Sequence, residues 1–153
     1  MSNTHHIPKG YHSVTPYLIV DNAKAAIEFY QKALGATLLF KMEGPGGKIA
    51  HAEIKIGDSP IMLGDEHPQE GHKSPKTYGG TPVSLMIYVE DVDAVAESAV
   101  KMGMKVQKPI ANQFYGDRSG FFEDPFGHYW SIATHIEDVS EDELKKRTAK
   151  LFG

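Results

Sequence analysis

The sequence of 153 residues contains no cysteine. Disulfide bonds, thiolate catalysis and cysteine-ligated zinc are therefore excluded. The sequence also lacks an apolar run that approaches the roughly 18 residues of a membrane span. Its polar N-terminal segment does not have the charged-then-apolar order of a signal peptide. We therefore expect a cytoplasmic protein with no membrane partner.

Positive charge is also scarce. The chain has 16 lysines and arginines against 20 acidic residues, which gives a formal net charge of −4. Nucleic-acid binding requires a basic stripe or patch, whereas the lysines here are scattered, so no nucleic-acid partner is expected. Apolar residues make up 41% of the chain and charged residues 24%. A single domain of this size buries roughly two thirds of its unfolded surface.

Residues 14–64 show the order β-α-β-β-β. Strands are predicted over 14–20, 36–42, 48–56 and 59–64, and a helix over 23–34. Asp21 and Asn22 can cap the start of this helix, and Gly35 can end it. The clearest alternation lies in 48–56, where apolar side chains alternate with His51, Glu53 and Lys55.

The same order returns after a polar connector, residues 65–80, which is rich in proline and glycine. Strands are predicted over 83–89, 104–110, 121–123 and 129–134. A helix is predicted over 92–102, with Asp91 as its N-cap and Gly103 as its C-cap. Ser140 and Glu143 have the spacing of a capping box, which predicts a C-terminal helix to about residue 151.

Two β-α-β-β-β modules can curl their sheets around a shared cavity with the helices outside, and such a cavity is a default ligand site. The segments YLIVDNAKAAIEFYQKALGA and DPFGHYWSI resemble the vicinal oxygen chelate superfamily. This superfamily includes glyoxalase I, bleomycin-resistance proteins, fosfomycin-resistance enzymes and extradiol dioxygenases. The resemblance implies an α+β fold with a curved mixed sheet, and a homodimer. It implies one domain over 1–139, with module one at 14–64 and module two at 81–136; the C-terminal helix predicted from the capping box occupies the remaining residues, 140–153.

Enzymes of this superfamily bind a divalent metal through four His or Glu ligands on the first and last strands of each module. The resemblance places these positions near Thr15, Met62, Ser84 and Ser131. Hydroxyl and thioether groups are poor ligands for such a cation. We therefore expect no metal cofactor and no glyoxalase I chemistry.

His51 and Glu53 lie two residues apart on a predicted strand, so both side chains point to one face. On the cavity face they could supply metal ligands or a general base. They would then belong to an alternative function, a metal-dependent lyase, isomerase or dioxygenase with a relocated site. On the other face they would be solvated or paired with their neighbours. His135 has the same parity as Ser131 and could lie near the cavity rim.

The parity of the strands adds apolar and aromatic side chains to the same wall. Tyr17 follows Thr15, Met86 and Tyr88 follow Ser84, and Tyr129 precedes Ser131. Such a wall suits a flat organic ligand, although these side chains could equally pack in the core. Trp130 has the opposite parity and is predicted to pack against a helix.

Arg118 is one of two arginines in the chain. It could clamp an anionic group at the cavity mouth, or it could form an ion pair with Asp117, Glu123 or Asp124. The sequence thus predicts metal-free binding of a small organic molecule. The candidate ligand-binding residues are Thr15, Tyr17, His51, Glu53, Met62, Ser84, Met86, Tyr88, Arg118, Tyr129, Ser131 and His135.

Overall fold

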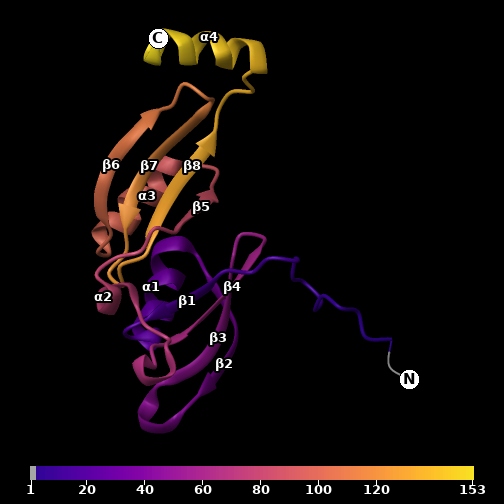
Figure 1. Cartoon of the computed structure of the whole chain (residues 1–153), viewed down its shortest axis with the longest axis vertical. Coiled ribbons are helices and arrows are strands. Elements are labelled where there is room, and N and C mark those ends of the chain that lie inside the picture. The colour runs from indigo at the N-terminus through magenta and orange to yellow at the C-terminus, as the bar shows by residue number, and fades with distance from the viewer. Residues whose placement is uncertain (1–2) are drawn as a thin grey trace. The chain divides into compact units, whose positions relative to one another are not determined.

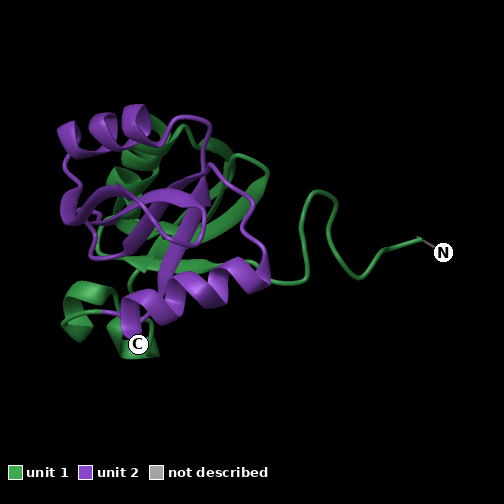
Figure 2. Cartoon of the chain, turned by 90° about the horizontal axis from the view of Figure 1, so that it is seen from above, with its two compact units in different colours: residues 1–80 green, residues 81–153 purple. Residues whose placement is uncertain are grey.

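The structure is a computed structural model that describes residues 3–153. The chain divides into two compact units, residues 1–80 and residues 81–153 (Figure 2). The observed sequence of elements repeats the predicted strand-helix-strand-strand-strand order in both units (Figure 1).

Unit one holds a mixed four-stranded sheet and one long helix. Strand β1 runs parallel to β4, whereas β3 is antiparallel to both β4 and β2, which gives the order β1-β4-β3-β2. The elements are β1 (Tyr17–Val20), α1 (Ala23–Leu34), β2 (Thr37–Glu43), η1 (Pro45–Gly47), β3 (Ile49–Ile56), β4 (Ser59–Asp65), η2 (Pro68–Glu70) and α2 (Pro75–Tyr78).

Unit two repeats this topology in the order β5-β8-β7-β6, again with the first and last strands parallel. Its elements are β5 (Ser84–Tyr88), α3 (Val92–Lys101), β6 (Lys105–Asn112), β7 (Asp117–Glu123), β8 (Tyr129–His135) and α4 (Glu141–Phe152). The α+β class and the mixed sheets predicted from the sequence are confirmed. No helix in the described part of the chain has the length and apolar character needed to cross a membrane.

The two long helices begin and end close to where their sequence signals lie. The Asn22 side chain accepts a hydrogen bond from Ala25 N, and Gly35 ends α1 with φ 67°. That left-handed conformation favours glycine. Helix α3 begins after the predicted N-cap Asp91, but it ends one residue early, with Met102 as its C-cap in place of Gly103.

Each sheet buries one face against its helix and leaves the other face to site residues. In β3, Ala52, Ile54 and Ile56 are buried and alternate with the partly exposed His51 and Glu53. Helix α1 contacts all four strands of its sheet, and α3 contacts β6, β7 and β8. We call the face that carries His51 in unit one, and the face that carries Ser131 in unit two, the far face of each sheet.

A side chain at the end of the last strand holds the start of the helix in each unit. Asp65 Oδ1 accepts a hydrogen bond from Ala23 N at 2.8 Å, and Thr134 Oγ1 accepts one from Val92 N at 3.0 Å. The paired residues are 42 apart in both units. Asp65 Oδ2 also accepts from Ile49 N at 2.7 Å, so this carboxylate ties helix, strand and hairpin together.

Two strands begin at residues other than the predicted ones. Strand β1 begins at Tyr17 in place of residue 14, and β7 begins at Asp117 in place of residue 121. The segment Asp117–Gly120 is polar and small, which resembles a loop, yet it pairs with Ile132–His135 of β8. The ladder to β8 outweighs the weak intrinsic strand preference of these residues.

Asp124 closes the turn between β7 and β8. Its Oδ1 accepts hydrogen bonds from Phe126 N at 2.8 Å and His128 N at 3.0 Å, and its Oδ2 accepts one from Trp130 Nε1 at 2.8 Å. Asp124 is 4% exposed and Trp130 is fully buried. The predicted packing of Trp130 on the helix side of the sheet is confirmed.

The substitution Asp124→Ala is expected to lower the free energy of unfolding by about 3 kcal/mol, because it leaves buried donors without an acceptor. Urea denaturation, followed by circular dichroism, measures the change. Asp58→Ala is the control, because Asp58 lies in an exposed turn and accepts only from Ser59 among the hydrogen bonds described. The control is expected to stay within about 0.5 kcal/mol of the wild type. Equal stability of the two variants would contradict the role of Asp124.

Candidate functional site

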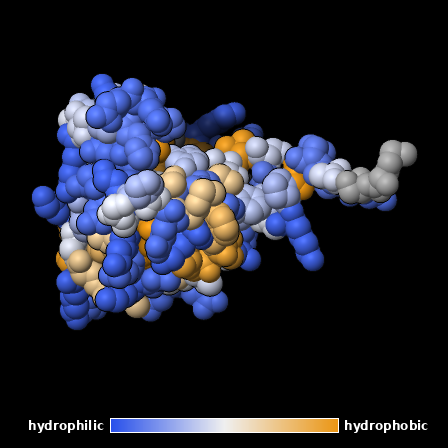
Figure 3. Space-filling view, turned by 90° about the horizontal axis from the view of Figure 1, so that it is seen from below, coloured by the Kyte–Doolittle hydropathy of each residue, from blue (hydrophilic) through white to orange (hydrophobic). Residues whose placement is uncertain are grey.

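The far face of unit one brings together four of the predicted site residues. The register aligns Tyr17 with Met62 and Met62 with Glu53, and His51 lies two residues before Glu53 on the same face. The apolar residues Phe40 and Met42 pair with Glu53 and His51 from β2 and are about half exposed. Figure 3 shows, on one side of the molecule, apolar side chains among hydrophilic ones. The sequence prediction that His51 and Glu53 share a face is confirmed.

These polar side chains form a hydrogen-bonded chain. The Tyr17 hydroxyl lies 2.9 Å from His51 Nδ1, and His51 Nε2 lies 3.0 Å from Glu53 Oε2. The hydroxyl of Tyr11 donates a hydrogen bond to Glu53 Oε1. The side chains of His51 and Glu53 are only 24% and 20% exposed. The two side chains are hydrogen-bonded to one another.

The hydrogen-bonding roles follow from the chemistry of the partners. An ionised carboxylate only accepts, so His51 Nε2 carries the hydrogen that bonds Glu53. In a neutral ring Nδ1 is then the acceptor, and the Tyr17 hydroxyl is its donor. Partial burial raises the pKa of the Tyr17 hydroxyl, so this group keeps its proton at neutral pH.

Gly64 leaves room for this arrangement. It lies beside Ile19 on β4, and its backbone is not in the left-handed region. A Cβ atom at Gly64 would lie 3.3 Å from the Tyr17 hydroxyl and 2.9 Å from Ala50 O. The close approach of Tyr17 and of the β3 backbone, not a turn, therefore requires glycine at this position.

The far face of unit two brings together six further predicted residues. The register aligns Ser84 with Tyr129, Met86 with Ser131 and Tyr88 with Ala133, and it places His135 opposite Asp117. The shared parity expected for these strands is confirmed. Among the predicted ligand-binding residues, Ser131 lines a cavity of about 310 Å³ on this face.

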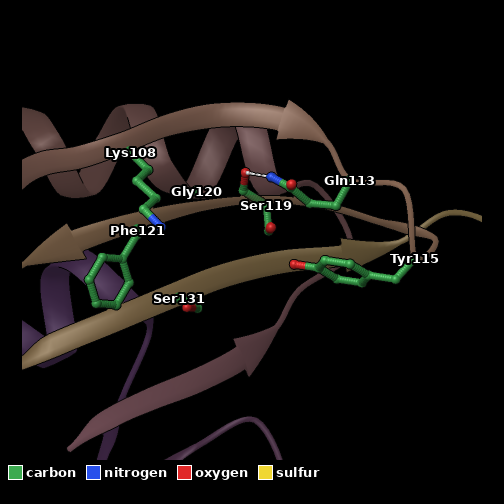
Figure 4. A pocket seen from close by; sticks show the side chains of 7 residues that line it. All are labelled: Lys108, Gln113, Tyr115, Ser119, Gly120, Phe121 and Ser131. Atoms are coloured by element: carbon green, nitrogen blue, oxygen red, sulfur yellow. Dashed lines mark hydrogen bonds between the residues drawn. The ribbon is translucent and has the colours of Figure 1, made fainter. Parts of the chain in front are cut away.

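The cavity has a mixed polar and aromatic lining (Figure 4). The hydroxyl of Tyr115 points into it, and the Lys108 side chain extends toward Phe121. The rings of Phe121 and Tyr129 stack at 5.5 Å with an interplanar angle of 14°. The amide of Gln113 donates to the carbonyl of Ser119 at 3.4 Å. The lining residues are Lys108, Gln113, Tyr115, Ser119, Gly120, Phe121 and Ser131.

A second polar cluster on this face is centred on a carboxylate. Tyr88 donates its hydroxyl hydrogen to Asp117 Oδ2 at 2.9 Å, and His135 Nδ1 lies 2.8 Å from Asp117 Oδ1. His135 Nε2 lies 2.7 Å from Asp138 Oδ1. These hydrogen bonds, first to Asp117 and then to Asp138, raise the pKa of His135. The hydrogen bond to Asp117 also raises the pKa of Tyr88.

Arg118 lies on the opposite face of the sheet, because it pairs with Thr134, which alternates with the far-face residues of β8. Its guanidinium binds Asp93 of α3 through two hydrogen bonds of 2.8 and 2.9 Å and binds Asn112 at 3.0 Å. The expected ion-pair partners Asp117, Glu123 and Asp124 were wrong, because strand alternation turns Arg118 toward the helix. Arg118 therefore cannot clamp an anionic group in the cavity on the far face. Thr15 lies before the start of β1.

Several site residues were missed by sequence reasoning. Ser119 belongs to the part of β7 that resembles a loop in the sequence, so strand alternation does not assign it to a face. Phe121 was assigned to a strand, but its alignment with Ser131 depends on the hairpin register. Tyr11 lies in a segment that resembles a flexible N-terminal arm, and no sequence signal links it to Glu53.

The donors at the superfamily metal positions do not fit a divalent cation. Met62 and Ser131 lie on the far faces, Ser84 is exposed at the start of β5, and none offers a carboxylate or an imidazole. Over residues 3–153, no group of three or more His, Asp or Glu side chains is arranged to hold a metal ion.

Comparison with known proteins supports this fold. The relative Mb0911c of Mycobacterium bovis, named an uncharacterized protein, is 42% identical over 136 residues, which cover 87% of this chain and 90% of its own. The structure of PA1353 from Pseudomonas aeruginosa has a TM-score of 0.66 at 27% identity and covers 82% of this chain and 99% of its own.

A mutant of the fosfomycin resistance protein FosX from Listeria monocytogenes, solved with Mn(II) and 1S,2S-dihydroxypropylphosphonic acid, has a TM-score of 0.62 at 19% identity. The match covers 87% of this chain and 94% of that protein, and it shows the fold alone. The model of one protein family matches residues 10–132. By this match, the chain belongs to the Glyoxalase/Bleomycin resistance protein/Dioxygenase superfamily.

Proposed function

We propose that this protein binds a small, planar, anionic organic molecule in the cavity of unit two without a metal ion. The observation that carries the proposal is the cavity of about 310 Å³ on the far face, where Lys108 and Phe121 lie beside one another (Figure 4). This volume is at the lower end of the range, about 300–1,000 Å³, that small-molecule sites occupy.

The chemistry of the lining supports this class of ligand. The stacked pair of Phe121 and Tyr129 offers a flat aromatic surface, on which a planar ring can lie. The ammonium group of Lys108 can pair with a carboxylate. The hydroxyls of Tyr115, Ser119 and Ser131 supply further hydrogen-bond partners at the wall.

The alternative, a metal-dependent lyase, isomerase or dioxygenase with a relocated site, has less support. On the far face of unit one, His51 and Glu53 bind Tyr17, Tyr11 and one another. The residues that the structure describes add no third His, Asp or Glu at ligand distance.

A homodimer is part of the same proposal. Exposed apolar residues outside the two proposed sites, such as Tyr78 and Val83, are surface that a second copy could cover. Sedimentation velocity at micromolar concentration measures the assembly state. A monomer over the whole accessible range would remove this part of the proposal without affecting ligand binding.

The substitution Lys108→Gln is expected to weaken binding of an aromatic carboxylate by about tenfold, since it removes the cation that faces the carboxylate. Kd is measured by NMR titration of ¹⁵N-labelled protein with 4-hydroxybenzoate. Lys105→Gln is the matched control on the same strand, because Lys105 is exposed and does not line the cavity. The neutral amide 4-hydroxybenzamide is expected to lose no affinity in either variant. Equal losses in the two lysine variants would refute the role of Lys108.

Removal of metal is expected to leave this binding unchanged. Protein treated with EDTA and dialysed should bind 4-hydroxybenzoate with the Kd of untreated protein, because side chains alone supply the contacts. Added Zn²⁺, Ni²⁺ or Mn²⁺ should change Kd by less than about twofold, which is below 0.5 kcal/mol. Binding that is restored only by one of these metals would support the alternative function.

A further inference from the structure

The hydrogen-bonded side chains of Tyr17, His51 and Glu53 stand in the order that a proton relay requires. The hydroxyl of Tyr17 donates to one nitrogen of His51, and the other nitrogen donates to the Glu53 carboxylate. When the Tyr17 hydroxyl takes a proton from a ligand, its own proton can pass to His51 Nδ1. Glu53 then stabilises the imidazolium that forms.

The cluster in unit two has the same residue types in a different order. There the carboxylate of Asp117 is central, and both Tyr88 and His135 bond to it. Tyr88 cannot pass its proton to His135, because Asp117 lies between them. The two clusters lie on equivalent faces of repeated modules, so unit two provides an internal control for unit one.

The hydrogen-bonded chain of unit one combines one half-exposed side chain with two that are largely covered. Tyr17 is 46% exposed, whereas His51 and Glu53 are largely covered. Phe40, with its ring centroid 6.3 Å from that of His51, and Met42 supply an apolar wall. Tyr11 holds the second oxygen of Glu53 and so fixes the carboxylate in place.

The same face offers one cation. Lys55 follows His51 and Glu53 on β3 with the same parity, about 7 Å along the strand from Glu53 and about 14 Å from His51, so its long side chain must extend along the strand to reach a carboxylate bound near Tyr17. Lys55 is exposed, and no salt bridge is described for it over residues 3–153. A substrate with a carboxylate could therefore be held near Lys55, with an apolar group against Phe40.

We propose that Tyr17, His51 and Glu53 form an acid–base site that catalyses the keto–enol tautomerisation of a small aromatic 2-keto acid. This site lies in unit one and does not depend on the cavity of unit two. The hydroxyl oxygen of Tyr17 accepts a proton from the carbon next to the ketone, while the proton of Tyr17 moves to His51.

The electron pair of the broken C–H bond forms the C=C bond of the enolate, and the negative charge moves to the ketone oxygen. Tyr17 then gives a proton to this oxygen and recovers its own from His51. The product is the enol, and all three side chains return to their starting state. No oxidant, reductant or metal enters this balance.

The probe is phenylpyruvate, whose tautomerisation is followed by the ultraviolet absorbance of the enol at several protein concentrations in one buffer. The wild-type protein is expected to accelerate the reaction in proportion to its concentration. Tyr17→Phe, which removes one oxygen atom, and His51→Gln are expected to lower kcat by about a hundredfold. Thermal unfolding of each variant shows whether it is folded.

The matched controls are Tyr88→Phe and His135→Gln, which make the same changes in the unit-two cluster. Both are expected to keep the wild-type rate. Lys55→Gln is expected to raise KM several-fold with kcat unchanged, because it removes the cation that binds the substrate's carboxylate and leaves the proton transfer intact.

Two results would overturn the proposal. One is the absence of any protein-dependent acceleration. The other is a folded Tyr17→Phe variant that retains the wild-type rate, which would mean that the activity arises elsewhere. Because Lys108→Gln tests binding in unit two with a different ligand, failure of one proposal can be told from failure of the other.

Discussion

The rest of the structure depends on the hydrogen bond that the first residue of each helix donates to a side chain on the last strand of its unit. Asp65 holds Ala23 N in unit one, and Thr134 holds Val92 N in unit two. Each bond links the parallel pair of strands to the helix that follows the first of them. The helix is thereby kept on one face of its sheet, and its apolar stripe is buried there. The opposite face is left for polar and aromatic side chains, and both proposed sites lie on such a face.

The two units show how one backbone arrangement can hold different chemistry. In unit one the far face carries a histidine between a phenol and a carboxylate, so protons can move along the chain. In unit two a carboxylate lies between Tyr88 and His135, and the neighbouring positions form a cavity with Lys108 and Phe121. Neither face places His or Glu at the metal positions of the superfamily, where Met62 and Ser131 stand. Membership of a superfamily therefore defines the fold of this protein more closely than its chemistry.

Much of the fold could be predicted because its signals are local. Caps at Asn22, Gly35 and Asp91 mark helix ends through interactions within a few residues. Strand alternation places His51 and Glu53 on one face without knowledge of any partner strand. The predictions failed where distant pairing decides the outcome. The polar segment that begins at Asp117 becomes a strand only because β8 lies beside it, and Tyr11 reaches Glu53 across 42 positions of sequence.

The sequence by itself determined the duplicated order of elements, the absence of cysteine chemistry and the shared face of His51 and Glu53. These properties depend on residue type and on short-range spacing. Only the tertiary structure decided that Tyr17 bonds to His51, that Arg118 binds Asp93 on the helix side, and that Lys108 meets Phe121 at a cavity. Such contacts depend on strand register and on side-chain direction, and a shift of one residue would turn each of these side chains to the other face.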